Sequence, residues 1–217
     1  QMRVRESWHL HGTEADKAQL IEAGVLCNSA VLSLNDSGEK VVIGDTTEGA
    51  LLYLAEEQGV DYISLREQYA LKEEFLFDSV RKMMSVVVQD KTRGHALVYT
   101  KGAPEMMLSR CVLTDDERAK IHTEIQRMAE TGLRTLGFGV KKLAMDNLEK
   151  IRLEDAENEL TFIGLVGIAD PPREAVKGAI ALAREAGVRT VMITGDNVVT
   201  ARAIAKEIGL MQEGDLA

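Results

Sequence analysis

The sequence is poor in cysteine, proline and aromatic residues, and it has no long apolar run. It holds 2 Cys, 3 Pro and 4% aromatic residues. Cys27 and Cys111 are far apart, and neither belongs to a Cys-x-x-Cys motif. A cysteine zinc site and a disulfide are therefore not indicated, and two reduced thiols are expected. No apolar stretch approaches the roughly 18 residues of a membrane-spanning helix, and no signal peptide is visible.

Positive charge is also scarce. The 217 residues carry 26 Lys and Arg against 35 Asp and Glu, a formal net charge of -9, and no basic cluster stands out. A face that binds DNA or RNA normally needs such a cluster, so the composition argues against a nucleic-acid partner. With 45% hydrophobic residues, the chain can bury an ample and mainly aliphatic core in one large domain or two small ones.

Short strands and helices alternate over about the first 155 residues. Their bounds follow from hydrophobic periodicity, capping residues and the positions of glycine and proline. Strands are expected at 2–10 (an edge strand), 41–43, the second half of 76–88, 96–100 and 133–141. Helices are expected at 14–27, from about 45 to 58, at 104–110 and at 114–132. Residues 61–76 fit a short helix followed by the start of a strand, and residues 142–159 fit a helix or a loop.

The pattern changes from about residue 160. Residues 160–168 and 188–193 are nearly continuous apolar runs, which are typical of strands buried on both faces. Helical periodicity follows each run, over 174–186 and through Ile204 and Ile208. Alternating strands and helices indicate a parallel α/β unit, so a domain boundary is predicted near residue 155.

A single lysine follows the apolar run 96–100. Gly102 permits a turn after Lys101, and Pro104 fits the first position of a helix. Glu105 then lies in the first helical turn, where the dipole favours negative charge. Lys101 is thus expected at the end of a strand, beside a glycine that leaves room for a ligand. The alternative is a solvated lysine in a strand-to-helix turn.

Five side chains of the first part could together bind a nucleotide. Adenine needs an aromatic or apolar face and a few polar groups at its edge, and phosphates need positive charge that is not cancelled nearby. The candidates are Glu48, Phe77, Lys82, Lys101 and Arg134. Each of them alone also fits an ordinary role, with the phenylalanine in the core, the cations in solvent and the glutamate complementing a helix dipole.

The second part carries polar residues where its expected strands end. Ligands bind at such carboxyl ends in open parallel sheets, and Asp170 and Thr194-Gly195-Asp196 lie there. A threonine hydroxyl at a helix N-terminus suits a phosphoryl oxygen, and Asp196 could hold Mg²⁺ directly or through water. The alternative is that Thr194 caps the next helix and Asp196 favours its dipole.

Six stretches resemble, in the same order, motifs of the P-type cation-transporting ATPases, and of their calcium-pump-like branch in particular. They are GDTTEGAL (44–51), FDSVRKMMSV (77–86), KGAPE (101–105), GLRTLGF (132–138), DPPR (170–173) and MITGDN (192–197). LCNSA (26–30) also resembles a family stretch, which implies a structural role for Cys27. Ser79 departs from the pattern, because several calcium pumps have an arginine there that contacts phosphate.

The resemblance implies an α/β (α+β) fold in two parts. A nucleotide-binding domain with a twisted antiparallel sheet and flanking helices would span 1–155. A partial phosphorylation domain of Rossmann-like, haloacid-dehalogenase-type architecture would span 156–217. The chain would then be a piece, from the cytoplasmic side, of a longer membrane pump, with the remainder of that pump as its partner.

The resemblance also implies roles for the candidate residues, with ATP and Mg²⁺ as cofactors. Adenine would stack on Phe77 and meet Glu48 at its amino edge. The pocket would be lined by Lys82, Lys101 and Gly102, with Arg134 reaching the phosphates. The transferred phosphate and its Mg²⁺ would be held by Thr194, Gly195 and Asp196, with Asp170 nearby.

No catalytic nucleophile is expected in this chain. The family forms an aspartyl phosphate on the aspartate of a DKTGT motif, which is absent. Asp90-Lys91-Thr92-Arg93-Gly94 is similar to it but is interpreted as a solvated hairpin turn. A free-standing haloacid-dehalogenase-like phosphatase and a non-catalytic nucleotide-sensing module are the alternatives to a pump, and calcium as the transported ion rests only on the branch that the motifs resemble.

Overall fold

An antiparallel sheet of six strands forms the centre of the computed structural model, which describes residues 2–144, 151–169, 175–194 and 198–211. The strand order is β1-β8-β7-β6-β5-β4, and all five neighbouring pairs are antiparallel. The strands are β1 (Arg3–His9), β4 (Tyr69–Asp78), β5 (Met83–Asp90), β6 (Ala96–Gly102), β7 (Arg134–Leu143) and β8 (Thr161–Ala169). The predicted sheet class and the position of β1 at an edge are therefore confirmed.

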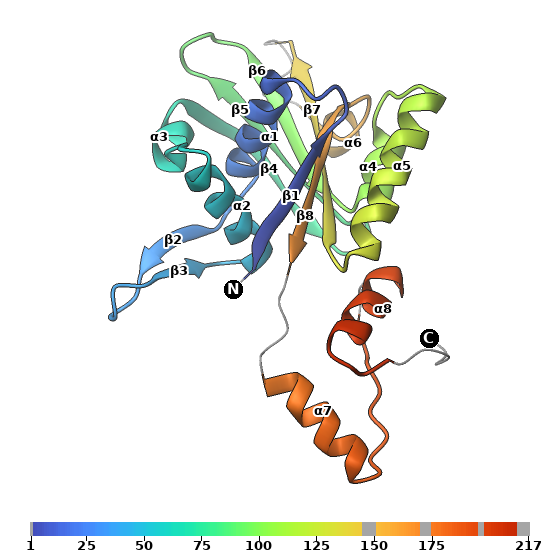
Figure 1. Cartoon of the computed structure of the whole chain (residues 1–217). Helices are drawn as coiled ribbons and strands as arrows, with labels where there is room; N and C mark the ends of the chain where they lie inside the picture. The colour runs from blue at the N-terminus through green and yellow to red at the C-terminus, as the bar shows by residue number, and fades with distance from the viewer. Residues whose placement is uncertain (1, 145–150, 170–174, 195–197, 212–217) are drawn as a thin grey trace.

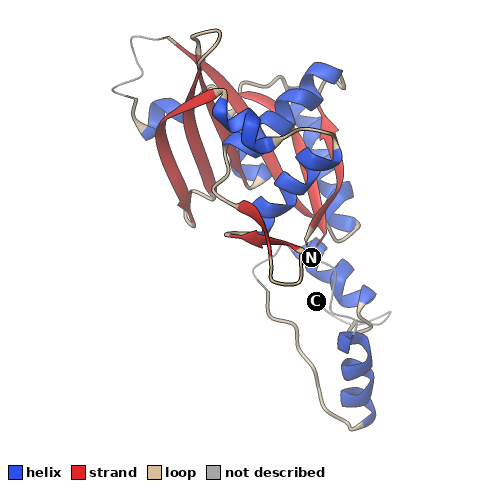
Figure 2. Ribbon diagram, turned by 90° about the vertical axis from the view of Figure 1, so that its left-hand side faces the viewer, coloured by secondary structure: helices blue, strands red, loops and turns tan. Residues whose placement is uncertain are grey.

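Helices cover both faces of this sheet (Figure 1). One face packs against α1 (Glu14–Leu26) and α2 (Thr46–Glu57), with α3 (Tyr62–Glu67) beside them. The other face packs against α4 (Pro104–Arg110), α5 (Asp115–Glu130) and the short α6 (Leu153–Ala156). A separate hairpin of β2 (Val31–Leu34) and β3 (Lys40–Ile43) projects near the N-terminus, and α7 (Ala175–Glu185) and α8 (Val198–Glu207) lie beyond the end of β8 (Figure 2).

Local signals fix the ends of the helices as the sequence predicts. The Asp45 carboxylate accepts N–H groups of the first turn of α2. Thr114 and Glu117 form the predicted capping box of α5. Gly59 and Gly132 follow the two helices with φ of 74° and 76°, a backbone region that favours glycine.

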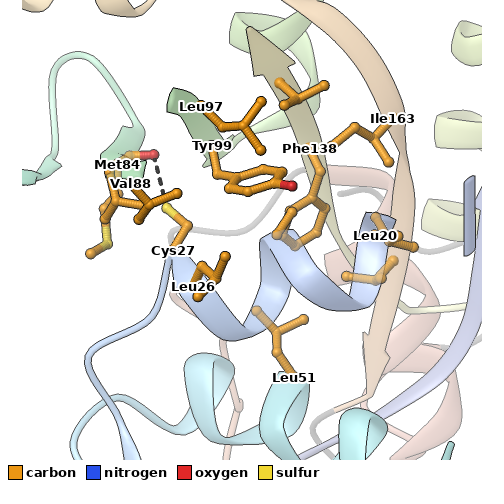
Figure 3. Close-up of a cluster of buried hydrophobic side chains, with 14 of the residues drawn as sticks. Leu20, Leu26, Cys27, Leu51, Met84, Val88, Leu97, Tyr99, Phe138 and Ile163 are labelled. Carbon is orange, nitrogen blue, oxygen red and sulfur yellow. Dashed lines mark hydrogen bonds between the residues drawn. The ribbon is translucent and has the colours of Figure 1, made fainter. Parts of the chain in front are cut away.

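The larger core cluster lies between α1, α2 and the sheet. Leu20 and Leu26 of α1 face Tyr99 and Phe138 of the sheet, and all four side chains are buried (Figure 3). The Cys27 thiol donates to the Met84 carbonyl at 3.4 Å, and burial raises its pKa to about 11. Cys27 and Cys111 are both free and buried, which confirms two separate thiols.

The structure corrects the expected direction of the strand at 160–168. This stretch forms most of β8, which lies between β1 and β7 and is antiparallel to both. Its run is apolar because Ile163 and Val166 face the α1 side while Phe162 and Leu165 face the α4 side. A continuous apolar run thus reports burial on two faces, but not the direction of the neighbouring strands.

The prediction of a buried strand at 188–193 is also wrong. These residues form an extended connection, with Val191 69% and Ile193 95% exposed. A buried strand needs a neighbouring strand to satisfy its backbone groups, and the described residues after Ala169 contain no second strand to pair with it. The haloacid-dehalogenase-like unit is therefore not seen there, and the division into two domains stays a prediction. Across the described ranges, no helix is both long and apolar enough to cross a membrane.

Candidate functional site

The nucleotide candidates gather at one end of the sheet. Because the strands are antiparallel, β4, β6 and β8 end where β5, β7 and β1 begin. This end carries Phe77 from β4, Lys82 just before β5, Lys101 and Gly102 from β6, and Arg134 from β7. The start of α2 adds Glu48. β8 ends at Ala169 at the same end (Figure 1).

Lys101 and Glu48 form a buried ion pair. The Lys101 ammonium donates to Glu48 Oε1 and to the Cys27 carbonyl, both at 2.5 Å. The two charged residues are only 6% and 8% exposed. The alternative of a solvated turn lysine is therefore excluded, and Lys101 is a fixed charge inside the protein.

The second oxygen of Glu48 holds the loop after α1. Glu48 Oε2 accepts from the Ser29 N–H at 2.9 Å, the Ser29 hydroxyl at 2.8 Å and the Ala30 N–H at 3.1 Å. Asn28 adds a bond from its amide to the Glu48 carbonyl at 2.9 Å. The LCNSA stretch thus wraps around Glu48, and its Asn28 side chain is buried while Ser29 stays exposed.

The local charges keep Glu48 ionised. Burial acts to raise the pKa of the Glu48 carboxyl, but the Lys101 ammonium and the hydrogen bonds from Lys101 and Ser29 outweigh it. The pKa therefore lies below its ordinary value. A buried and hydrogen-bonded ion pair gives this end of the sheet a rigid polar centre.

Arg66 supports the same loop and was not among the sequence candidates. Its guanidinium donates to the carbonyls of Val25, Asn28 and Ala30 at distances of 2.8 to 3.1 Å. Burial lowers the pKa of this group. Arg66 lies in α3, about 40 residues along the chain from these carbonyls, and nothing in its local pattern distinguishes it from a surface arginine.

Phe77, near the end of β4, and Lys82, just before β5, lie exposed at the two ends of a tightly held turn. Phe77 is 62% exposed, so it is not a core residue. The Asp78 carboxylate accepts the N–H groups of Val80 at 3.0 Å and Arg81 at 2.8 Å. Lys82 has a φ of 53° and donates its N–H to the Asp78 carbonyl. The turn therefore presents an aromatic face and a cation from a fixed backbone.

Gly102 lies in close contact with the residues at the start of β5. A Cβ atom on Gly102 would lie 2.6 Å from the Lys82 carbonyl oxygen and 2.5 Å from Met83 Cγ. The space that a side chain would take at this glycine is thus filled by Lys82 and Met83. The expected place of Gly102 in a nucleotide pocket stays a prediction. The residue permits the close approach of two backbones, which brings Lys101 next to the turn that carries Lys82.

Gly102→Ala is expected to lower the free energy of unfolding by about 1–3 kcal/mol, because the added methyl overpacks this contact. Gly178→Ala in α7 is the control, since nothing lies within 4 Å of its Cβ position. The control is expected to raise the helix stability by about 0.5–1 kcal/mol. Urea denaturation of the two variants measures both values, and an equal effect at both glycines would contradict the close-approach role.

The remaining candidates are only partly described. Arg134 is exposed at the start of β7, opposite Ile168 of β8. Thr194 is exposed as well. Asp170, Gly195 and Asp196 lie outside the described residues, so the expected phosphate and Mg²⁺ cradle is not tested. Within the described ranges, no group of three or more His, Cys, Asp or Glu side chains could hold a metal ion.

Asp90 forms the hairpin turn that its sequence context indicates. Its carboxylate accepts the N–H groups of Thr92 at 2.7 Å and Arg93 at 2.8 Å. The turn residues are mostly exposed, but Asp90 itself is 7% exposed and therefore is not solvated as expected. It ends β5, about 20 Å along the strand from Met84, the residue that faces Lys101.

Comparison with protein families gives one match that covers most of the chain. Residues 16–175 match the family described as "P-type ATPase, cytoplasmic domain N". The match includes every described candidate in the sheet and α2, and it confirms the likeness that the six motifs indicate.

Curated relatives agree with this match. The chain is 40% identical over 215 residues to "Calcium-transporting ATPase 1" of Lactococcus lactis, which covers 94% of the chain and 24% of that protein. It is 39% identical over 203 residues to "Calcium-transporting ATPase" of Bacillus subtilis, covering 89% and 22%. It is 37% identical over 199 residues to "Sodium/potassium exporting P-type ATPase cta3" of Schizosaccharomyces pombe, covering 88% and 19%. The chain thus spans about a quarter of the length of such relatives or less.

Proposed function

The chain belongs to the P-type ATPase family, and from this premise we propose that it binds ATP for a pump that couples ATP hydrolysis to cation transport. The observation that carries the proposal is the exposed aromatic ring of Phe77 at the same end of the sheet as the buried Lys101–Glu48 pair. In a chain with 4% aromatic residues, a phenylalanine that is 62% exposed on a fixed turn is an available stacking surface. Family membership favours the pump over a free-standing phosphatase or a sensing module.

We propose that adenine stacks on Phe77 and that Lys101 contacts its edge. Glu48 already accepts four hydrogen bonds, which is about the capacity of a carboxylate. Its expected contact with the amino edge of adenine is therefore replaced by an indirect role, in which it orients Lys101. An ammonium has three N–H donors, and the described contacts of Lys101 use two of them. The third is proposed for the ligand.

The phosphates are proposed to lie toward Lys82 and Arg134, which are exposed at the same end of the sheet. Thr194, Gly195 and Asp196, with Asp170, remain the proposed partners of the transferred phosphate and of Mg²⁺ by their motif. The two aspartates supply the oxygen ligands that Mg²⁺ prefers. Because β8 belongs to the antiparallel sheet, we place the proposed boundary between the nucleotide domain and the phosphorylation domain after Ala169.

The activity of the longer protein is a proposal as well. It would hold this region on the cytoplasmic side of a membrane, next to the other pump domains. The names of the relatives include calcium-transporting and sodium/potassium-exporting ATPases. A cation is therefore proposed as the transported species, with calcium as the first ion to test.

Saturable binding of ADP or ATP, measured by isothermal titration, is the expected result for the folded chain. Phe77→Ala is expected to weaken the binding free energy by about 1–3 kcal/mol, the value of stacking one base on an aromatic ring. Val80→Ala is the control, because Val80 is 85% exposed in the same turn but has no aromatic face. An absence of any response at millimolar nucleotide in a folded sample would refute the proposal.

A further inference from the structure

A second buried carboxylate lies behind the sheet, on the face opposite the Lys101–Glu48 pair. Glu157 follows α6 and is only 2% exposed. Its neighbour Ala156 packs against Val87 and Val98, which point to the α6 side of β5 and β6. Its chemistry is not used by the proposed nucleotide contacts.

Two side chains of the β4–β5 region donate to this carboxylate. Glu157 Oε1 accepts from the Arg81 guanidinium at 2.7 Å and from the Ser85 hydroxyl at 2.6 Å. The Ser85 hydroxyl lies 2.9 Å from that of Thr100 on β6. The Arg81 side chain is 14% exposed, so this ion pair is largely removed from water. One carboxylate therefore connects α6 to both the sheet and the turn.

Arg81 extends the connection to the residues on either side of Phe77. Its other guanidinium nitrogen donates to the Leu76 carbonyl at 2.5 Å. Its backbone N–H donates to the Asp78 carboxylate at 2.8 Å. The residues before and after Phe77 are thus both held by Arg81, while the ring itself stays exposed.

A buried ion pair of this kind is a poor source of stability, because desolvation of both charges offsets their attraction. Its distinctive property is geometry, since a planar guanidinium can reach two acceptors in fixed directions at once. Here the two acceptors are a rigid carboxylate and the carbonyl next to Phe77. This arrangement can therefore fix the direction of the turn between β4 and β5.

We propose that Glu157 and Arg81 are positioning residues for nucleotide binding. Glu157 orients the Arg81 guanidinium, which fixes the Phe77–Lys82 turn from behind the sheet. The ring of Phe77 is thereby held ready for adenine before the ligand arrives, which reduces the entropy cost of binding. This inference rests on the proposed function of Phe77.

Arg81→Lys is the main test, because lysine retains the charge for Glu157 but lacks the fork that also reaches the Leu76 carbonyl. Without nucleotide, hydrogen exchange of the amide of Lys82 is expected to be about tenfold faster than in the parent chain. ADP affinity is expected to fall about tenfold, because a displaced binding group loses its alignment. Glu157→Gln is expected to act in the same direction in both measurements.

Ser85→Ala is the matched control. It removes a hydrogen bond to the same Glu157 oxygen but leaves the contacts of Arg81 in place. Its ADP affinity and the exchange of the Lys82 amide are expected to stay within about twofold of the parent values, even if the melting temperature falls. A loss in Ser85→Ala as large as that in Arg81→Lys would overturn the proposal in favour of general destabilisation.

The two measurements separate the two levels of the proposal. If the parent chain does not bind ADP, the proposed function fails, and the exchange data still decide whether Arg81 fixes the turn. Unchanged exchange in both Arg81→Lys and Glu157→Gln would overturn the positioning role. If the variants show faster exchange but the same ADP affinity as a parent chain that binds ADP, the Arg81–Glu157 pair has only a structural role and the proposal is overturned. If Arg81→Lys does not fold, Glu157→Gln alone decides by the same criteria.

Discussion

Lys101→Met is expected to lower the free energy of unfolding by about 3–5 kcal/mol, because it leaves the buried carboxylate of Glu48 without its cation. The substitution also removes the donor to the Cys27 carbonyl. The KGAPE motif alone predicts that a change at Lys101 weakens nucleotide binding and leaves the fold intact. The structure adds the large effect on stability, which guanidinium denaturation without nucleotide measures.

Lys40→Met is the control for this result. Lys40 also pairs with a glutamate, Glu56, at 2.7 Å, but its side chain is 51% exposed. An exposed pair of this kind contributes about 0–1 kcal/mol. The double variant Glu48→Gln with Lys101→Met is expected to recover part of the loss, because no buried charge remains. Equal losses for Lys101→Met and Lys40→Met would show that the Lys101 pair is not buried in solution.

No covalent phosphoenzyme is expected when this chain is incubated with γ-labelled ATP and Mg²⁺. Phosphoryl transfer needs a nucleophile in line with the γ-phosphate and a metal that neutralises the developing charge. Asp90 is the residue whose sequence context is similar to the family's phosphorylated aspartate. Its carboxylate is occupied by the Thr92 and Arg93 N–H groups, at the far end of β5 from Lys101.

The measurement is an acid quench followed by a search for hydroxylamine-labile label. ADP titration of the same sample shows that it is folded and able to bind, so that a negative result is informative. Asp90→Asn is the matched variant, and it is expected to behave like the parent chain. Stoichiometric label that maps to Asp90, and that disappears in Asp90→Asn, would overturn the assignment of this segment to a hairpin turn.

The sequence by itself determined the elements whose signals are local. The capping box at Thr114 and the cap at Asp45 are read from residues within one turn of the helix they begin. The hairpin at Asp90 follows from a polar stretch between two apolar runs. The family also follows from local information, because each motif is a short stretch of consecutive residues that resembles a family motif. The family match over residues 16–175 confirms it.

Only the tertiary structure decided how distant segments meet. The apolar run of β8 indicates burial on two faces, but its antiparallel pairing with β1 and β7 depends on partners more than 20 residues away. The run at 188–193 has strand-forming composition, yet it forms no strand in the described structure because composition supplies no pairing partner. Strand direction is a property of long-range contacts, and hydrophobic periodicity does not contain it.

The same distinction holds for the candidate site. Glu48 and Lys101 were recognised singly from their motifs, but their mutual pairing joins residues 53 positions apart. Arg66 and Glu157 have no local signal at all, and their roles arise from backbone and side-chain groups brought to them by the fold. The sequence determined which chemical groups this protein has at the candidate site. The tertiary structure decided which of them are buried and paired and which face solvent, because burial and pairing depend on neighbours that are remote along the chain.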